Sequence, residues 1–583
     1  MAPSGTRERW LAPLLFAACT RLGASTEAPP PTLGDESAAG ADMGGDSGQD
    51  SPAAARAGSK ARGGAGGGGS DAARETTNPY VEPAGAPAEL PARTFRLSHA
   101  EYAASVEALV QKTIDVSDLE PELDNGIYRN MSSSGLVRTD LLEEYYAKAR
   151  AVTDALDTEE LEALVPGHEL EAEAKSRFIA ASVERAFRRP ATDAELEAYG
   201  SLFELGASEG DITLAFRSVL RALLTSPHFL YRTELGASDA GDEFSLTDHE
   251  VASLLSYGLE GRPPSEELFA AADRGELTDP KRLEDHVREL VAGTRAEASL
   301  AAFAAEWLEL DAFQISGAPG DPPLPEKDAA SFPGFDDVRS AMQEEARSFV
   351  EGHAGLDATL EELLTTDVPE PRGALGDFYR SGQSGSAGGE RHGVLSLGAL
   401  LSLGAHETRG SPTLRGLFVR KRLLCQEVHP PGRAPPALDR TQAGADAKTT
   451  RELYEQHAKQ AACVGCHAEL DAIGFTLESF DGAGRFRTEE NGVAIDTTGD
   501  LSGTDRDRAL ADHAELARAL AESEWVRECV ATQAFRRYFG ELESARGLPP
   551  IQAARRALRA GTFGEALVAL WSTPSTYRRR REP

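Results

Sequence analysis

The sequence feature that most constrains this chain is the pentapeptide Cys-Val-Gly-Cys-His at residues 463–467. The chain has 583 residues and only five cysteines, yet Cys463 and Cys466 lie three positions apart and directly precede His467. From composition alone, this arrangement would occur roughly once in a thousand chains of this kind. Residues three apart lie on one face of a helix, so both thiols can reach the same partner. We therefore expect the three side chains to act together.

This spacing is typical of covalent haem attachment. Two thiols can add to the two vinyl groups at one porphyrin edge, and the imidazole of His467 can then bind the iron. Gly465 leaves room for the porphyrin edge to approach the backbone. Three alternatives remain. A zinc site would need two more ligands, and no second Cys-x-x-Cys occurs. A thioredoxin-like redox pair would follow a β-strand, whereas this region is predicted to be helical. The third alternative is a structural pair without a cofactor.

The N-terminal residues have the pattern of an export signal. Arg7 and Arg9 precede an apolar run, Trp10 to Ala18, that is too short to span a bilayer. The sequence Phe-Ala-Ala before Cys19 resembles a bacterial lipoprotein cleavage box, so we expect residues 1–19 to be a signal peptide and Cys19 to be lipidated. Secretion without a lipid and a buried segment of a cytosolic protein are the alternatives. Residues 20–93, rich in Ala, Gly, Ser and acid, are predicted to be a disordered linker.

The charge of the chain limits its partners. A formal net charge of −35 argues against nucleic acid, because a polyanion would be repelled over most of the surface. The same charge favours basic partner proteins. No later apolar stretch reaches membrane-spanning length, so we expect contact with a membrane only through a lipid anchor.

Beyond residue 93 the pattern is predominantly helical. Amphipathic runs rich in Ala and Leu begin at capping boxes, in which a Ser or Thr precedes a Glu by three positions; these are Ser98–Glu101, Thr192–Glu195, Thr247–Glu250 and Thr449–Glu452. Asp279-Pro280 marks another helix start. Asn491-Gly492, between two extended segments, predicts a β-hairpin. The predicted fold class is mostly α, a multi-helix, multidomain protein with one small hairpin.

Several stretches together resemble a known group of proteins. The stretches are LSHAEYAASVEALV at 97–110, AFRRPATDAELEAY at 186–199, RALLTSPHFLYRTELG at 221–236, LTDHEVASLLSYGLEGRPPSEEL at 246–268, AHETRGSPTLRGLFVRKRLLC at 405–425, CVGCHAELDAIGFTLESFDGAGRFR at 463–487 and ECVATQAFRRYFG at 528–540. They resemble secreted, cytochrome-c-containing proteins of unknown function that are typical of planctomycetes and myxobacteria. The resemblance covers most of residues 95–580 and implies export and haem. The chain departs from the group at Gly258 and Glu260, which replace aromatic residues, and at Ala472, which replaces proline.

With this resemblance, the chain beyond the linker divides into five predicted parts. The predicted domains are an N-terminal helical domain at 94–165, helical domains at 166–238 and 239–370, a cytochrome-c-like haem domain at 371–503 and a C-terminal helical domain at 504–583. A length of 583 residues is consistent with several domains, because single cores stop growing near about 250–300 residues.

The second axial ligand of the iron is less constrained by the sequence. No methionine follows the haem motif, so the alternatives are a distal histidine, an open or water-bound site, or Met342 from another domain. His406, in the family-like stretch Ala-His-Glu-Thr-Arg, is one candidate distal ligand. His457 is a weaker candidate, because it lies on the predicted lead-in helix, Thr449–Ala462, where a hydrogen-bonding or packing role is the alternative.

Arginines after the motif are candidate partners for the haem propionates. Arg485 and Arg487 could each pair with a propionate in a bidentate manner. Surface pairing with Glu478 or Asp481 is the alternative.

The two remaining cysteines, Cys425 and Cys529, form an even pair once the others are assigned to lipid and haem. In an oxidising compartment they can form a disulfide. Two buried free thiols are the alternative.

These observations predict an exported monohaem protein with covalent haem c, located in the periplasm or on the outer membrane or cell surface. Its predicted activity is one-electron transfer with a redox partner protein, and the helical regions before the haem domain would contact a partner or substrate. Two alternatives remain: a haem-dependent oxidoreductase with an open iron site, and a non-catalytic surface-binding or scaffold lipoprotein.

Overall fold

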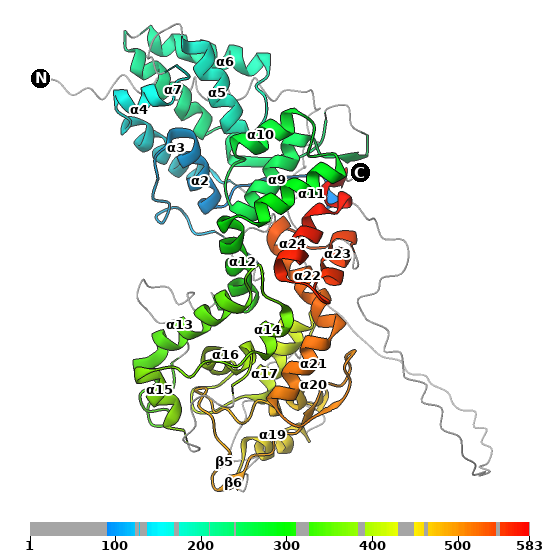
Figure 1. Cartoon of the computed structure of the whole chain (residues 1–583). Helices are drawn as coiled ribbons and strands as arrows, with labels where there is room; N and C mark the ends of the chain where they lie inside the picture. Colours follow the sequence, from blue (N-terminus) through cyan, green and yellow to red (C-terminus); the bar gives the residue numbers. More distant parts are fainter. Residues whose placement is uncertain are drawn as a thin grey trace, which may run out of the picture. The chain divides into compact units, whose positions relative to one another are not determined.

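The protein's structure is a computed structural model that describes residues 90–122, 128, 137–167, 174–208, 210–237, 241–310, 326–382, 391–428, 448–459, 464–543 and 548–581 (Figure 1). These residues all belong to one unit, Thr76–Pro583. The predicted signal peptide with Cys19, and most of the predicted linker, lie outside the described residues. The boundaries of the predicted domains stay predictions.

Helices dominate the first half of the described chain. They are α2 (His99–Val110), α3 (Thr139–Asp154), α4 (Thr158–Ala163), α5 (Lys175–Phe187), α6 (Asp193–Ala207), α7 (Ile212–Leu224), α8 (Pro227–Leu230), α9 (Asp248–Glu260), α10 (Glu266–Asp273), α11 (Pro280–Val291) and α12 (Thr294–Trp307).

Helices also dominate the second half, which confirms the predicted fold class. They are α13 (Phe335–His353), α14 (Leu360–Thr365), α15 (Gly373–Arg380), η5 (Val394–Ser396), α16 (Gly398–Leu403), α17 (Pro412–Phe418), η6 (Val419–Leu423), α19 (Thr450–Ala458), α20 (Val464–Phe475), α21 (His513–Glu522), α22 (Glu524–Phe539), α23 (Pro549–Ala557), α24 (Phe563–Ser572) and η7 (Pro574–Tyr577). Within the described residues, none of these helices is both long enough and apolar enough to cross a bilayer.

The predicted helix starts are confirmed. In all four capping boxes the Ser or Thr hydroxyl accepts the Glu amide, and the Glu carboxylate accepts the amide of the Ser or Thr. Asp279 caps α11 by accepting the amides of Lys281 and Arg282, with Pro280 at the first position. Each reciprocal pair satisfies backbone donors that a helix start would otherwise leave without partners.

The predicted hairpin is also confirmed. Strands β5 (Glu489–Glu490) and β6 (Val493–Ala494) pair antiparallel around Asn491 and Gly492. Both turn residues have positive φ, 51° and 76°, the backbone conformation that an Asn-Gly turn of this type requires. A second antiparallel pair, β7 (Gly499–Asp500) with β8 (Ala509–Leu510), follows.

The sequence analysis did not predict the strands that join the two ends of the described chain. Strand β9 (Arg578–Arg580) lies between β1 (Leu90–Pro91) and β4 (Glu243–Ser245), and β2 (Arg93–Arg96) pairs with β3 (Tyr231–Glu234). The carboxylate of Glu234, 2% exposed, lies between the guanidiniums of Arg93 and Arg579. Strands of two to four residues carry too short a pattern to identify, and their partners are far away in sequence.

One apolar cluster runs from Leu90 to Tyr577. The indole of Trp571, which is fully buried, packs where α9 passes α24. A Cβ on Gly258 would lie only 2.4 Å from the Trp571 ring, so an aromatic residue cannot occupy this position beside that tryptophan. This contact gives a physical reason for the glycine at position 258.

Candidate functional site

Helix α20 carries the residues after the cysteine pair. It begins at Val464 and ends at Phe475, so Cys466 and His467 lie in its first turn. Cys463 lies outside the described residues, and for Cys466 the description covers the backbone but not the side chain. The lead-in helix α19 ends at Ala458, earlier than the predicted Ala462, where the Lys459 amide bonds to the Gln456 carbonyl at 3.3 Å and closes the last turn.

The imidazole of His467 is hydrogen-bonded to a carboxylate on its own helix. Its Nδ1 atom donates to Oδ2 of Asp471 at 2.7 Å, and Oγ1 of Thr413 donates to the other carboxylate oxygen at 2.5 Å. Asp471 is 4% exposed. Because Nδ1 carries the proton, the lone pair of the ring is on Nε2, which is the tautomer that an Nε2 metal ligand requires.

Sequence reasoning missed both partners of His467. Asp471 follows the histidine by four positions, which places the two side chains on the same helix face, and this spacing could have identified it. Thr413 comes from α17, a separate part of the sequence, and no local pattern indicates it.

Two glycines allow α17 to approach α20 closely enough for these contacts. The two helices lie side by side in Figure 1 and make extensive contact. A Cβ on Gly416 would lie 1.9 Å from the Leu470 carbonyl oxygen, and a Cβ on Gly474 would lie 1.9 Å from the Pro412 carbonyl oxygen. Only glycine fits at both points, and the contact brings Thr413 to Asp471.

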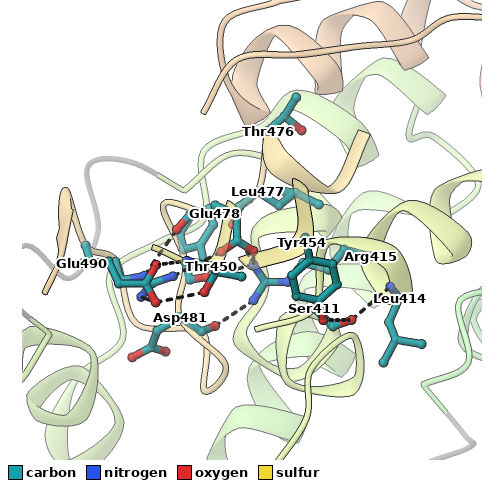
Figure 2. A network of polar contacts seen from close by, with 12 residues as sticks. Ser411, Leu414, Arg415, Thr450, Tyr454, Thr476, Leu477, Glu478, Asp481 and Glu490 are labelled. Atoms are coloured by element: carbon teal, nitrogen blue, oxygen red, sulfur yellow. Dashed lines mark hydrogen bonds and ion pairs between the residues drawn. The ribbon is translucent and has the colours of Figure 1, made fainter. Parts of the chain in front are cut away.

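Arg415 fixes the loop that follows α20. Its buried guanidinium donates to the carbonyls of Leu477, Phe480 and Asp481 at 2.7–2.9 Å, and to the carboxylate of Glu478 at 3.2 Å (Figure 2). Burial raises the pKa of Glu478, while Arg415 and Arg487 oppose that rise. The guanidinium therefore replaces the backbone bonds that an irregular, buried loop lacks.

The same polar network ties the hairpin to the start of α19. Arg487 bridges Glu478 and Glu490 at 3.2 and 3.3 Å. Glu490 also accepts both the amide and the hydroxyl of Thr450, at 2.6 and 2.9 Å (Figure 2). The helix before the cysteine motif, α19, and the loop after α20, which carries Cys466 and His467, are thereby anchored to one buried cluster. Such anchoring would keep the motif in a fixed orientation.

The candidate distal ligand His406 lies near the same region. Its Nε2 is 3.4 Å from the hydroxyl of Tyr454, which donates to Ser411 at 3.1 Å, and the Tyr454 ring centroid is 6.1 Å from that of His467. Burial, with Arg409 and Lys327 nearby, lowers the pKa of His406. Tyr454 thus contacts both histidines, and the distal role of His406 stays a prediction.

A pocket of about 340 Å³ opens beside His467. Its apolar lining consists of Ala458, Ala468, Ala472, Phe475 and Gly499. The backbone of Ala472 lies so close to Gly499 that a Cβ on that glycine would lie 2.0 Å from the Ala472 carbonyl oxygen.

The residues present fit a haem at this position. The pocket combines an imidazole of fixed tautomer with an apolar wall that suits a macrocycle face. The guanidinium of Arg451, 4.0 Å from the Phe475 ring centroid, also lines the pocket, where it pairs with Glu455 at 3.3 Å and with Asp496 at 3.7 Å. Among the described residues, no three His, Cys, Asp or Glu side chains form a separate metal site.

The structure gives Arg485 and Arg487 protein partners. Nε of Arg485 donates to Asp481 at 2.7 Å, and its guanidinium lies 5.4 Å from the ring centroids of Phe332 and Phe378. Arg487 pairs with Glu478. Both arginines thus pair with the acidic residues named as the alternative, Glu478 and Asp481, and a role toward a haem propionate stays a prediction.

The other candidate residues divide between those that the structure places and one that it does not describe. Cys425 and Cys529 form a disulfide, with their Cα atoms 5.3 Å apart. Met342 is fully buried and accepts the Ser402 hydroxyl at 3.7 Å, within the apolar cluster. His457 lies on α19, and its side chain is outside the described residues.

Comparison with known families gives three matches. Residues 391–490 match PSCyt3, residues 246–380 match PSD4 and residues 174–234 match PSD5, each described as a protein of unknown function, DUF1588, DUF1592 and DUF1595 respectively. These are planctomycete-type, cytochrome-c-like domain families, and the PSCyt3 match includes the Cys-Val-Gly-Cys-His motif. The resemblance inferred from the sequence is confirmed at this level. No curated protein and no solved structure matches the chain.

Proposed function

We propose that the protein is an exported monohaem c-type protein that transfers single electrons. Cys463 and Cys466 would attach the haem, and His467 would bind its iron through Nε2. The observation that carries this proposal is the hydrogen bond from His467 to Asp471 directly after the Cys-x-x-Cys spacing. Bound there, haem would supply a couple between ferric and ferrous iron.

The chain's own residues would orient the ligand and adjust its electron donation. Asp471 keeps the proton of His467 on Nδ1 and draws it toward a negative charge, which makes the imidazole a stronger donor. Thr413 donates to the same carboxylate and moderates that effect. Arg451, which lines the pocket, would face a propionate.

Export and a basic partner belong to the same proposal. The N-terminal signal pattern with Cys19 would place the protein in the periplasm or on the cell surface, anchored by lipid. The disulfide between Cys425 and Cys529 supports an oxidising compartment. A net charge of −35 favours a positively charged redox partner and disfavours nucleic acid.

A haem-dependent oxidoreductase is the second candidate. Its support is that the two candidate distal ligands whose side chains the structure describes have other contacts: His406 lies against Tyr454, and Met342 is buried against Ser402. Iron with one protein ligand could bind an oxidant, and the carboxylate behind His467 would favour the ferric form.

The first experiment tests covalent haem. Full-length protein from a host competent in c-type maturation should keep its ferrous absorption band after acid–acetone extraction, and its intact mass should include one tetrapyrrole. The Cys463→Ser/Cys466→Ser variant should lose both signals, whereas the matched Cys425→Ser/Cys529→Ser variant should keep them. Colourless wild-type protein of unmodified mass would refute the proposal.

The second experiment separates the carrier from the enzyme. A six-coordinate carrier should resist carbon monoxide and cyanide, and electron paramagnetic resonance of the oxidised protein should report two strong axial ligands. Rapid binding of carbon monoxide and of cyanide to the native protein, together with a high-spin ferric signal, would instead support the oxidoreductase.

A further inference from the structure

We propose that a second pocket, formed by α2, α5, α10 and the turn before α10, binds a neutral oligosaccharide. The groove has a volume of about 570 Å³, within the range of about 300–1,000 Å³ typical of small-molecule sites. It contains none of the residues of the candidate haem site, so this inference is independent of the proposed function. Three of the stretches that carry the family resemblance, 97–110, 186–199 and 246–268, contribute to its lining.

The α5 wall of the groove is fixed by a buried arginine. α5 ends at Phe187, and the capping residue that follows, Arg188, has a φ of 59° and is 5% exposed. Its guanidinium donates to the carbonyls of His228, Phe229 and Tyr231 at 2.6–3.2 Å. These bonds hold the end of α5 against the end of α8, so this wall does not need a ligand to form.

The opposite wall is the turn between α9 and α10. Gly261 ends α9 with a φ of 67°, and the Ser256 hydroxyl donates to the Arg262 carbonyl at 2.9 Å. Pro263 and Pro264 follow, and their rings restrict the backbone. A groove with two rigid walls loses little conformational entropy when a ligand binds.

The lining has an apolar part and a charged part. The apolar side chains are Ala108, Ala181, Pro263, Pro264, Phe269 and Ala270. They provide a surface that suits the C–H face of a sugar ring.

The charged side chains that line the groove include carboxylates and guanidiniums in similar numbers. Arg185 pairs with Glu266 at 3.2 Å between α5 and α10, and Asp273 pairs with His249 at 3.1 Å. Within the part of the chain that the structure describes, the side chains of Glu184 and Arg262 form no hydrogen bond or ion pair. Both line the groove and are half-buried. They are the groups that a ligand could bind without breaking an existing contact.

The presence of both carboxylates and guanidiniums in the groove favours an uncharged ligand. An anionic ligand would meet the carboxylates of Glu184, Glu266 and Asp273, and a cationic ligand would meet the guanidiniums of Arg185 and Arg262. A hydroxyl group can donate to a carboxylate and accept from a guanidinium, so a molecule with many hydroxyls and no charge satisfies both. With the apolar surface, these features favour a neutral saccharide.

The test is an array of immobilised oligosaccharides, with neutral glucans, mannans, xylans and galactans beside uronic-acid and amino sugars, probed with the full chain. We expect retention by neutral glycans, followed by measurement of affinity for the best one by calorimetry. Arg262→Ala and Glu184→Ala should each weaken that affinity about tenfold or more, because each removes a hydrogen bond to a charged group. Arg288→Ala, an exposed arginine of α11 paired with Glu284, is the matched control and should bind as wild type.

Retention by charged glycans alone, retention by none, or wild-type affinity in both groove variants would overturn the proposal. Because no groove residue contacts His467, the haem absorption spectrum should be the same in every variant. A variant without the haem absorption spectrum would therefore have failed to mature. A variant with a normal spectrum but weaker glycan binding would show that the groove residue contributes to that binding.

Discussion

Nδ1 of His467 lies 2.7 Å from Oδ2 of Asp471, one turn further along α20, and this contact links the candidate axial ligand to a buried carboxylate. The electron donation of the imidazole then depends on the charge of its neighbour. Thr413 shares the carboxylate, so α17 also influences the ligand. Two variants follow from this arrangement.

Asp471→Asn should raise the midpoint potential of the haem. The neutral amide accepts a weaker hydrogen bond than the carboxylate, so the imidazole donates less charge and ferrous iron is favoured. A difference of about 1 kcal/mol between the two bonds corresponds to roughly 40 mV for one electron. Spectroelectrochemical titration measures the shift, and an unchanged or lower potential would contradict the role of Asp471.

Thr413→Val should change the potential in the opposite direction. Removing the hydroxyl leaves the Asp471 carboxylate with one donor fewer, which strengthens its bond to His467 and favours ferric iron. Because the side-chain volume is nearly conserved, a purely structural disturbance would not produce opposite signs in the two variants. Equal shifts of the same sign would show that packing, not charge, is responsible.

Gly258→Ala should destabilise the fold by about 1–3 kcal/mol, because the added Cβ overlaps the Trp571 ring. Trp571→Phe in the same background should recover part of that loss by making space. Denaturant unfolding of the two single variants and the double variant gives the coupling free energy. Strictly additive effects would mean that the two residues do not compete for this space.

Replacing both Cys425 and Cys529 by serine should lower the free energy of unfolding by up to about 4–5 kcal/mol. The bond closes a loop with a sequence separation of 104, and removing it restores entropy to the unfolded chain. Unfolding curves with and without a thiol reductant provide the check. Reductant should lower the free energy of unfolding of the wild-type protein but not that of the double variant. The reverse pattern would mean that the disulfide is not the source of the stabilisation.

The stability of the chain should fall in acid partly through Glu234. Burial opposes ionisation, but Arg579 and Arg93 outweigh it and hold the pKa of Glu234 at about 2, below the 4.5 of an ordinary glutamate. The ionised form therefore stabilises the fold fully above about pH 4.5, and roughly 3 kcal/mol of this stabilisation is lost as the pH falls toward 2.

The matched variant for this pH effect is Glu234→Gln. At neutral pH it should be less stable than wild type, since Arg579 loses its buried charge partner and Arg93 keeps only Glu541. When unfolding is measured from about pH 6 to about pH 2.5, the difference in unfolding free energy between wild type and Glu234→Gln should become smaller in acid. A difference in unfolding free energy that does not change with pH would exclude the Glu234 carboxylate as the source of the loss of stability in acid.

Local sequence patterns predicted the helix starts, the hairpin and the position of the candidate axial ligand. A capping box and an Asn-Gly turn each depend on atoms within a few residues, so the information is contained in one short stretch. His467 was found in the same way, from its place beside Cys466. Asp471 also lay within reach of such reasoning, at i+4, although it was not singled out.

Contacts between distant segments could not be predicted in this way. Thr413 reaches Asp471 only because Gly416 and Gly474 allow α17 and α20 to pack closely. Strand β9 pairs with β1, although most of the chain separates the two in sequence. Those outcomes depend on backbone approach and buried charge, which are properties of packed elements and not of any single stretch. The sequence by itself determined which residues are candidates for haem binding and where helices begin. Tertiary packing decided which side chains surround the His467 imidazole, because contacts between distant segments form only when those segments pack together.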